Sequence, residues 1–207
     1  MTEHVRGAPD APVTVVEYGD YECPYCAAAA PVLRQLVDGS GGRVRLVFRN
    51  FPLAEPHPYA LTAALAAEAA DAQGAFWPMH DLLFERQDRL TDVALRAYAD
   101  SLGLDGGLVV GEPAQAFGDR VEADFAEGLA LGVEGTPTLF INGTRYTGRM
   151  EIDALRRAVG GGTDASGAGG TPGTGRQRRW SLGSRRAQRE AVTEQPQEEH
   201  AEDGGGS

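Results

Sequence analysis

Two cysteines, Cys23 and Cys26, are the residues of this chain best suited to covalent chemistry. They stand in the stretch ECPYC with Pro24 and Tyr25 between them, and no other cysteine occurs among the 207 residues. A dithiol with this spacing can form and break a disulfide bond. A redox centre is therefore the interpretation that fits the pair best.

Two other interpretations of the cysteine pair fit less well. A structural zinc site needs four ligands, but there is no second cysteine pair, and the mid-chain histidines, His57 and His80, lack paired ligand spacing. A structural disulfide across two intervening residues would close a loop too short to restrain much of the unfolded chain. We therefore expect no metal and no bound organic cofactor.

The elements around the pair explain how it would work. VTVVEY (Val13–Tyr18) is rich in β-branched residues and predicts a strand, and a helix is predicted from about Pro24 to Val37. Cys23 would then lie at the helix N-terminus, where amide N–H groups and the helix dipole favour a thiolate, the attacking species. Cys26, one turn later, would resolve the mixed disulfide formed at Cys23.

Two neighbouring residues bear on this chemistry. Glu17 lies in the apolar strand, six residues before Cys23, and the pattern leaves its face open. If Glu17 is buried behind the cysteines, its pKa should rise and it could take the proton of Cys26; a Glu17 that faces water would do neither. Tyr25 has no imidazole, so we expect Cys23 to be less acidic than in a Cys-Pro-His-Cys site.

The remaining segments predict an α/β fold. VRLVFRN (Val44–Asn50) is a second strand, TLFINGTRYTG is a hairpin with its turn at Asn142-Gly143, and Glu151–Val159 is a closing helix. This order gives the βαβ and ββα halves of a thioredoxin-like sheet, with a helical subdomain inserted at about 60–131. The insertion contains the predicted helices Ala60–Ala72, Trp77–Arg86, Asp92–Gly103 and Gln115–Leu131.

The pattern over residues 8–159 resembles the DsbA-like thiol–disulfide oxidoreductases of the thioredoxin superfamily. APVTVVEYGDYECPYC is similar to the family's first strand and active site, with the acidic residue at Glu17 in the matching position. VFRNFPL and GAFWPMHDLLFERQD resemble later segments, and GVEGTPTLFING resembles the cis-proline loop and the strand after it. The resemblance implies a cis bond between Thr136 and Pro137 that faces the cysteines. Thr136 and Pro137, with Pro24 and Tyr25, would then form a surface for an extended substrate.

Glutaredoxins also use Cys-Pro-Tyr-Cys and are the nearest rival family. Cys26 and Pro137 lie 111 positions apart, about twice the separation in a compact thioredoxin or glutaredoxin. The predicted helical insertion fills that interval, and such an insertion is the DsbA-like feature.

The expected function is a thiol–disulfide oxidoreductase that exchanges disulfides with protein thiols or disulfides, or with low-molecular-weight thiols. The direction of exchange is open. Two alternatives also remain: a redox-inactive peptide-binding or chaperone-like domain, and a glutathione-type conjugating or isomerising enzyme of the same fold.

Composition limits the partners and the location. The net charge of -11 argues against nucleic acid or an anionic membrane, and no apolar run approaches the ~20 residues of a membrane helix. The first residues lack a basic segment followed by an apolar one, so we expect a cytoplasmic protein, and the net charge suits a monomer. From Gly160 the composition becomes glycine-rich, then basic, then acidic, which predicts a disordered tail over 160–207 or, alternatively, an interaction arm.

Overall fold

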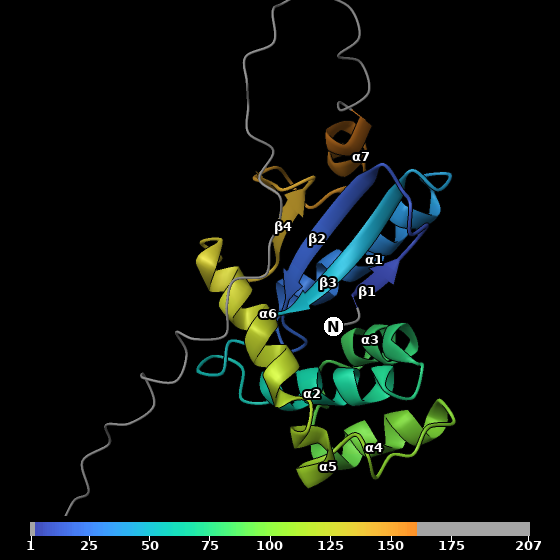
Figure 1. Ribbon diagram of the computed structural model, residues 1–207, viewed down its shortest axis with the longest axis vertical. Coiled ribbons are helices and arrows are strands. Elements are labelled where there is room, and N and C mark those ends of the chain that lie inside the picture. The colour runs from blue at the N-terminus through green and yellow to red at the C-terminus, as the bar shows by residue number, and fades with distance from the viewer. Residues whose placement is uncertain (1–2, 161–207) are drawn as a thin grey trace, which may run out of the picture. The chain divides into compact units, whose positions relative to one another are not determined.

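A computed structural model describes residues 3–160 (Figure 1). The tail predicted for 160–207 lies outside the described residues, apart from Gly160. Residues 3–160 form a thioredoxin-like α/β fold, as predicted, with a five-stranded mixed sheet and helices around it.

The sheet has the strand order β1-β3-β2-β4-β5. β2 and β3 run parallel and are joined by α1, while the other neighbours are antiparallel, which gives the predicted βαβ and ββα halves. The short edge strand β1, which pairs with β3, was not predicted. The strands are β1 (His4–Arg6), β2 (Val13–Gly19), β3 (Val44–Asn50), β4 (Thr138–Ile141) and β5 (Thr144–Tyr146).

The hairpin between β4 and β5 turns where the sequence predicts. Asn142 has φ 48° and Gly143 has φ 80°, so both central residues are left-handed. That is the requirement of the tight turn that Asn-Gly favours. The hairpin places β4 beside β2, with Leu139 opposite Glu17.

One face of the sheet is covered by α1 (Pro24–Asp38), which lies behind the strands in Figure 1. Side chains alternate along a strand, so Val13, Val15 and Glu17 of β2 share this face. Val13 and Val15 pack in a buried cluster with Leu33 of α1. The strand and the helix of the cysteines are therefore held together by the apolar core.

The opposite face packs against α6 (Gly118–Ala130). Tyr18 points to this side and meets Phe51 and Phe140 edge-on, with ring centroids 6.2 and 5.9 Å apart. A Cβ on Gly128 of α6 would lie 2.7 Å from Phe51 Cδ2 and 3.0 Å from Tyr18 Cδ1. The missing side chain at Gly128 is what lets α6 approach the aromatic rings this closely.

Five helices lie between β3 and β4, and α2 to α5 occupy the region beyond the carboxyl ends of β2 and β3 (Figure 1). α2 is alanine-rich and buried almost all round, which is typical of a helix enclosed by neighbours. No helix in residues 3–160 is both long enough and apolar enough to cross a membrane. The helices not yet bounded are α2 (Ala60–Asp71), α3 (Phe76–Glu85), α4 (Asp92–Ser101), α5 (Gly111–Gln115) and α7 (Ile152–Gly160).

The helix predicted over Gln115–Leu131 corresponds to α6, which begins three residues later, at Gly118; the short helix α5, which ends at Gln115, was not predicted. The N–H groups of Ala116 and Phe117 bond to the carbonyls of Pro113 and Ala114, three positions earlier, at 3.4 and 3.1 Å. This tighter pattern ends α5 and lets the chain change direction before α6 begins.

Candidate active site

Cys23 is the N-cap residue of α1, in an extended conformation with φ -75° and ψ 120°. Its N–H donates to the Asp20 carbonyl at 3.1 Å, and its own carbonyl accepts from the N–H groups of Cys26 and Ala27, both at 3.1 Å. Pro24 follows at the start of the helix, where its missing N–H leaves no bond unmade. Both cysteines are free thiols, so the structure is that of the dithiol form.

The surroundings of Cys23 lower its pKa to about 5. The largest cause is a hydrogen bond from the Cys26 side chain; partial burial opposes it, and the Thr136 side chain and the backbone amides of Cys26 and Tyr25 add to it. The amides are those of the first helical turn, as predicted, but the neighbouring thiol contributes more than they do. This pKa lies above the about 3–4 of the most acidic thiols of this kind, and the effect of the Tyr25 side chain stays a prediction.

The loop before β4 lies against Cys23. The Thr136–Pro137 peptide bond is cis, as the resemblance implied, and the Cys23 thiol donates to the Thr136 carbonyl with an Sγ–O distance of 3.4 Å. The buried hydroxyl of Thr136 has no hydrogen-bond partner within residues 3–160. That hydroxyl is therefore available to a Cys23 thiolate, which explains its effect on the pKa.

Cys26 is fully buried, at 0% exposure. The backbone N–H of Asp20 donates to its sulfur at 3.5 Å. The pKa of Cys26 is raised far above the ordinary thiol value, first by burial, then by its hydrogen bond to Cys23 and by the charge of Glu17. The two thiols are thus strongly different, with an ionised Cys23 beside a Cys26 that keeps its proton until an acceptor removes it.

Glu17 lies in the second half of β2, on the face covered by α1, and is 0% exposed. Within the described part of the chain, neither carboxyl oxygen has a hydrogen-bond partner. Burial, and then the charge of Cys23, raise the pKa of Glu17 to about 8. The expectation that a buried Glu17 has a raised pKa is confirmed. A buried, unpaired carboxyl group beside two thiols costs stability and marks a functional candidate.

A buried carboxylate at Asp20 is a feature that the sequence analysis missed. Its oxygens accept from the N–H of Glu22 at 2.8 Å, from the N–H of Leu53 at 2.9 Å and from Nδ1 of His57 at 2.8 Å. The sequence predicts His57, which has a proline on either side, as a loop or helix-entry residue, with a place beside the site as the alternative. Asp20 and His57 are 37 positions apart, and the pattern of the sequence carries no signal that joins them.

Gln87, just after α3, is a second residue that the sequence analysis missed. Its amide nitrogen donates to the carbonyls of Tyr21 and Cys23, at 2.9 and 2.8 Å. One side chain from the inserted helices therefore holds the loop that carries the first cysteine.

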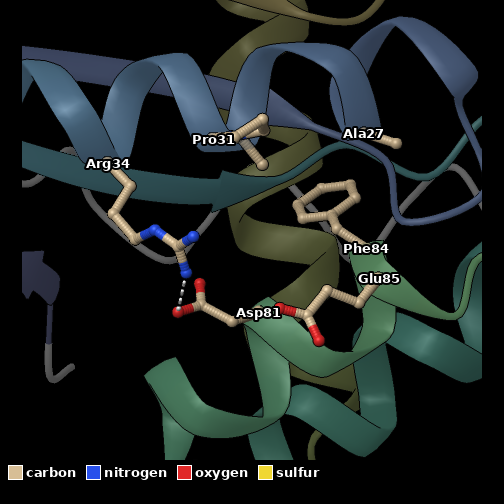
Figure 2. Close-up of a pocket in the computed structure, with 7 residues that line it drawn as sticks. Ala27, Pro31, Arg34, Asp81, Phe84 and Glu85 are labelled. Carbon is tan, nitrogen blue, oxygen red and sulfur yellow. Dashed lines mark hydrogen bonds and ion pairs between the residues drawn. The ribbon is translucent and has the colours of Figure 1, made fainter.

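Cys23 is itself buried, at 4% exposure, but the two residues that follow it are exposed. Pro24 is exposed and the Tyr25 side chain is 73% exposed, so both are accessible to a partner. A separate pocket of about 140 Å³ lies between α1 and α3, lined by Ala27, Pro31 and Phe84 among others (Figure 2). Its lining does not include the cysteines or Thr136. The candidate site is therefore a buried pair of thiols with exposed residues, Pro24 and Tyr25, at its edge, and it is separate from this pocket.

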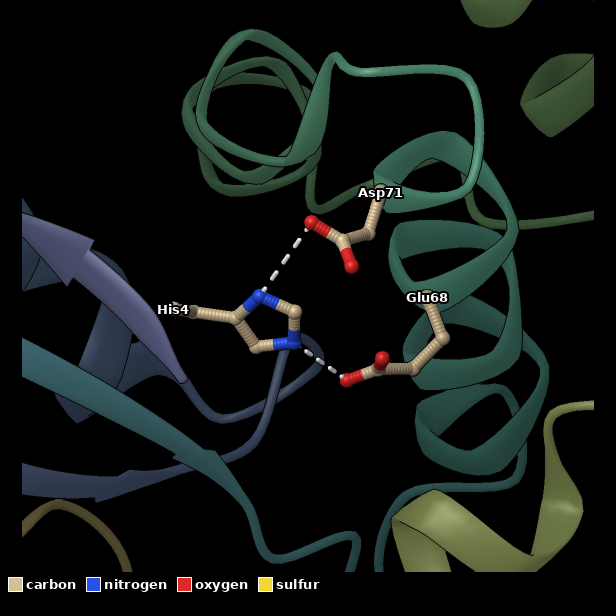
Figure 3. Close-up of side chains that lie close together, drawn as sticks. All are labelled: His4, Glu68 and Asp71. Atoms are coloured by element: carbon tan, nitrogen blue, oxygen red, sulfur yellow. Dashed lines mark hydrogen bonds and ion pairs between the residues drawn. The ribbon is translucent and has the colours of Figure 1, made fainter. Parts of the chain in front are cut away.

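His4, Glu68 and Asp71 form the one group among residues 3–160 whose type and closeness suit a metal ion (Figure 3). His4 lies 2.8 Å from Glu68 and 3.5 Å from Asp71. The guanidinium of Arg120 lies 2.9 Å from Glu68 and 3.1 Å from Asp71, so it supplies the positive charge that these carboxylates attract. The cluster is an ion-pair network that joins β1, α2 and α6, and such buried networks depend on every partner being present.

Residues 1–160 match the family model described as thioredoxin. The chain is 49% identical over 158 residues to Na(+)/H(+) antiporter NhaA 1 of Salinispora arenicola (strain CNS-205), and 50% identical over 159 residues to NhaA 3 of Salinispora tropica. Each alignment covers 76% of this chain and 24% of the relative, so the chain spans about a quarter of the length of these curated relatives. The activity in those names describes the longer proteins. The cytoplasmic location and the monomeric state stay predictions.

Solved structures lead to the same family. A thioredoxin-like oxidoreductase from Silicibacter pomeroyi DSS-3 is 30% identical, with a TM-score of 0.68 over 79% of this chain and 94% of that chain. BdbD from Bacillus subtilis is 27% identical, with a TM-score of 0.68 over 77% and 91%. The thiol-disulfide exchange protein alpha-DsbA2 from Wolbachia pipientis, at 22% identity and a TM-score of 0.69 over 79% and 88%, shares the fold. The chain belongs to the thioredoxin family, and its structural neighbours are DsbA-like thiol–disulfide oxidoreductases.

Proposed function

We propose that this chain exchanges disulfides with thiol partners, using Cys23 as the nucleophile and Cys26 as the resolving thiol. The observation that carries the proposal is the contrast between the two sulfurs. The pKa of Cys23 is lowered to about 5, while that of the buried Cys26 beside it is raised. At neutral pH Cys23 is therefore a thiolate that can attack, while Cys26 is still a protonated thiol.

The proposed reaction has two steps. The Cys23 thiolate attacks a partner disulfide, so that a Cys23–partner bond forms and the partner's own S–S bond breaks, with one partner sulfur leaving as a thiolate. Cys26 then loses its proton and attacks Cys23 Sγ, which expels the second partner sulfur. The chain's dithiol is oxidised to a disulfide, and the partner gains two electrons. The same steps in reverse oxidise a partner dithiol.

Glu17 is the proposed proton acceptor for Cys26. Burial, and then the charge of a Cys23 thiolate, keep the pKa of Glu17 at about 8, so Glu17 stays mostly protonated at neutral pH. Formation of the mixed disulfide removes that charge, and the pKa of Glu17 falls. Burial still raises the pKa of Glu17, so only a fraction of Glu17 is ionised; that fraction accepts the Cys26 proton and returns it when the reaction runs in reverse.

The proposed substrate surface consists of Thr136, Pro137, Pro24 and Tyr25. Its support is the exposure of the Pro-Tyr dipeptide and the closeness of the Thr136 carbonyl to Cys23. An extended partner segment beside Thr136 would align its sulfur with the nucleophile. Protein thiols or disulfides and low-molecular-weight thiols are the proposed partners. The neighbour from Silicibacter pomeroyi, a thioredoxin-like oxidoreductase at 30% identity, supports a redox role for this surface.

Single-cysteine variants test the proposal. Exchange with a disulfide-bonded peptide should be lost in Cys23→Ser, while Cys26→Ser should still carry out the first step and accumulate a mixed disulfide detectable by mass spectrometry. Exchange that survives both replacements would defeat the proposal. The reduction potential of the wild-type couple then gives the direction, since about -270 mV is typical of a reductase and about -120 mV of an oxidase.

A further inference from the structure

The backbone of Asp20 contacts both cysteines. Its N–H donates to Cys26 Sγ at 3.5 Å, and its carbonyl accepts from the N–H of Cys23 at 3.1 Å. A small movement of this one residue therefore changes hydrogen bonds at both halves of the dithiol at once. The proposed mechanism assigns no role to the Asp20 side chain.

The Asp20 side chain anchors that backbone in the interior. Its carboxylate is fully buried and accepts from the backbone N–H groups of Glu22 and Leu53, at 2.8 and 2.9 Å. Its third donor is Nδ1 of His57, at 2.8 Å. Charge-assisted hydrogen bonds of this length are about twice as strong as neutral ones. Together, the three hydrogen bonds to the Asp20 carboxylate connect the loop of the cysteines to the segment that follows β3.

His57 is itself held in place by the start of the helical insertion. Its N–H donates to the Leu53 carbonyl at 3.0 Å, and its carbonyl accepts from the N–H of Ala60, the first residue of α2, at 3.1 Å. The His57 side chain is 17% exposed, so the ring bridges the buried carboxylate and the surface. A proton on Nδ1 is what allows the ring to donate to the carboxylate.

We propose that His57 and Asp20 are a positioning pair that sets the equilibrium between the dithiol and disulfide forms of the Cys23–Cys26 couple. The inference rests on the proposed function. A sulfur in the reduced form is a better acceptor than a disulfide sulfur, because it carries more negative charge, so the Asp20 N–H stabilises the reduced form. Loss of the His57 bond leaves a buried carboxylate oxygen with one partner fewer. The loop then relaxes, and the reduced form loses part of its stabilisation.

The test compares His57→Leu, which removes the donor, with His57→Asn, whose amide nitrogen lies near the position of Nδ1 and keeps the donor. Each protein is equilibrated with reduced and oxidised glutathione. In His57→Leu the equilibrium constant should shift toward the disulfide by about tenfold, which corresponds to a reduction potential about 30 mV more negative. His57→Asn should stay within about threefold of the wild type, because one hydrogen bond to the carboxylate is restored.

Gln73→Leu is the matched control. It removes another side chain that fastens a loop, through bonds to the backbone of Asp105, at the opposite end of α2 from His57. It should leave the glutathione equilibrium unchanged. If His57→Leu does not fold, His57→Gln takes its place, since its amide nitrogen corresponds to Nε2 and points away from Asp20.

The outcomes separate the two proposals. A wild-type protein that does not equilibrate with glutathione contradicts the proposed function. A wild-type protein that equilibrates, together with a folded His57→Leu or His57→Gln variant that has the wild-type constant, contradicts the positioning role alone. A His57→Asn variant as strongly shifted as His57→Leu also contradicts it, because the restored hydrogen bond should be sufficient.

Discussion

Cys23 Sγ lies 3.4 Å from the carbonyl oxygen of Thr136, although 113 positions separate the two residues in the chain. The contact joins the two halves of the fold, since Cys23 precedes α1 and Thr136 precedes β4. It brings the nucleophile, a backbone acceptor and a buried hydroxyl group together at one point. The acidity of Cys23 is therefore a property of both halves and not of the cysteine motif alone.

Thr136→Val should raise the pKa of Cys23. The replacement keeps the shape of the side chain and removes the hydroxyl group that is available to the thiolate. A single hydrogen bond contributes about 1 kcal/mol, and one pKa unit corresponds to about 1.4 kcal/mol, so we expect a rise of about one unit or less. The measurement is the ultraviolet absorbance of the thiolate against pH. Thr136→Ser keeps the hydroxyl group and should titrate like the wild type; equal titration of the valine variant would contradict the assignment.

Glu17→Gln should stabilise the protein more at high pH than at low pH. The pKa of Glu17 is raised from 4.5 to about 8 in the folded state, so the folded protein binds the proton more tightly than the unfolded chain. Stability contributed by Glu17 is therefore lost as pH rises through this range, and the loss is complete above about pH 8. The glutamine variant has no such titration. We expect its advantage in free energy of unfolding to grow by a few kcal/mol, roughly, between pH 5 and pH 9.

Urea unfolding at several pH values measures this difference, and the comparison with wild type cancels most of the Cys23 contribution. Glu122→Gln, an exposed change on α6, is the control and should show no pH-dependent gain. A gain for Glu17→Gln that stays constant with pH would argue against a buried, titrating Glu17.

Gln87→Leu should weaken both the fold and the exchange reaction. The change leaves the carbonyls of Tyr21 and Cys23 without their amide donor. A partly buried carbonyl group that has lost its hydrogen-bond donor costs about 1–3 kcal/mol of unfolding free energy. Gln73→Leu removes a similar amide from another loop, but its bonds to Asp105 are exposed, so it should reduce stability by less. Exchange kinetics separate the two, since only Gln87→Leu should slow the reaction; equal rates in both variants would remove Gln87 from the site.

Gly128→Ala should destabilise the protein, although alanine is the better helix former. A Cβ there would lie 2.7 and 2.8 Å from the ring of Phe51, so α6 would have to move from the sheet. Overpacking of this kind costs about 1–3 kcal/mol. Gly118→Ala, in the same helix with no atom within 4 Å of its added Cβ, should instead be neutral or stabilising by up to about 1 kcal/mol. In thermal unfolding, we expect the melting temperature to fall in Gly128→Ala and to stay the same or rise in Gly118→Ala.

Local signals in the sequence were sufficient for much of the fold. The β-branched run at Val13–Tyr18, the Asn142-Gly143 turn and the alanine-rich stretch at Ala60 each depend on backbone preferences that act over a few residues. The strand β1 escaped prediction because three residues, His4–Arg6, carry too little pattern. The place of β1 in the sheet is decided by its pairing with β3, a strand that comes after the helix of the cysteines in the chain.

The candidate site also combines features that follow from the sequence with features that only the fold decides. By itself the sequence determined the dithiol and its position at the start of a helix, whereas the loop at Thr136-Pro137 was implied by the resemblance to a known family. Only the tertiary structure decided the face of Glu17, because Glu17 and Tyr18 are both buried and the strand therefore shows no alternation at that point. It also decided the partners of Asp20, which come from segments that approach one another only after the helices have packed. Buried polar contacts of this kind depend on packing between distant segments, which no local pattern in the chain records.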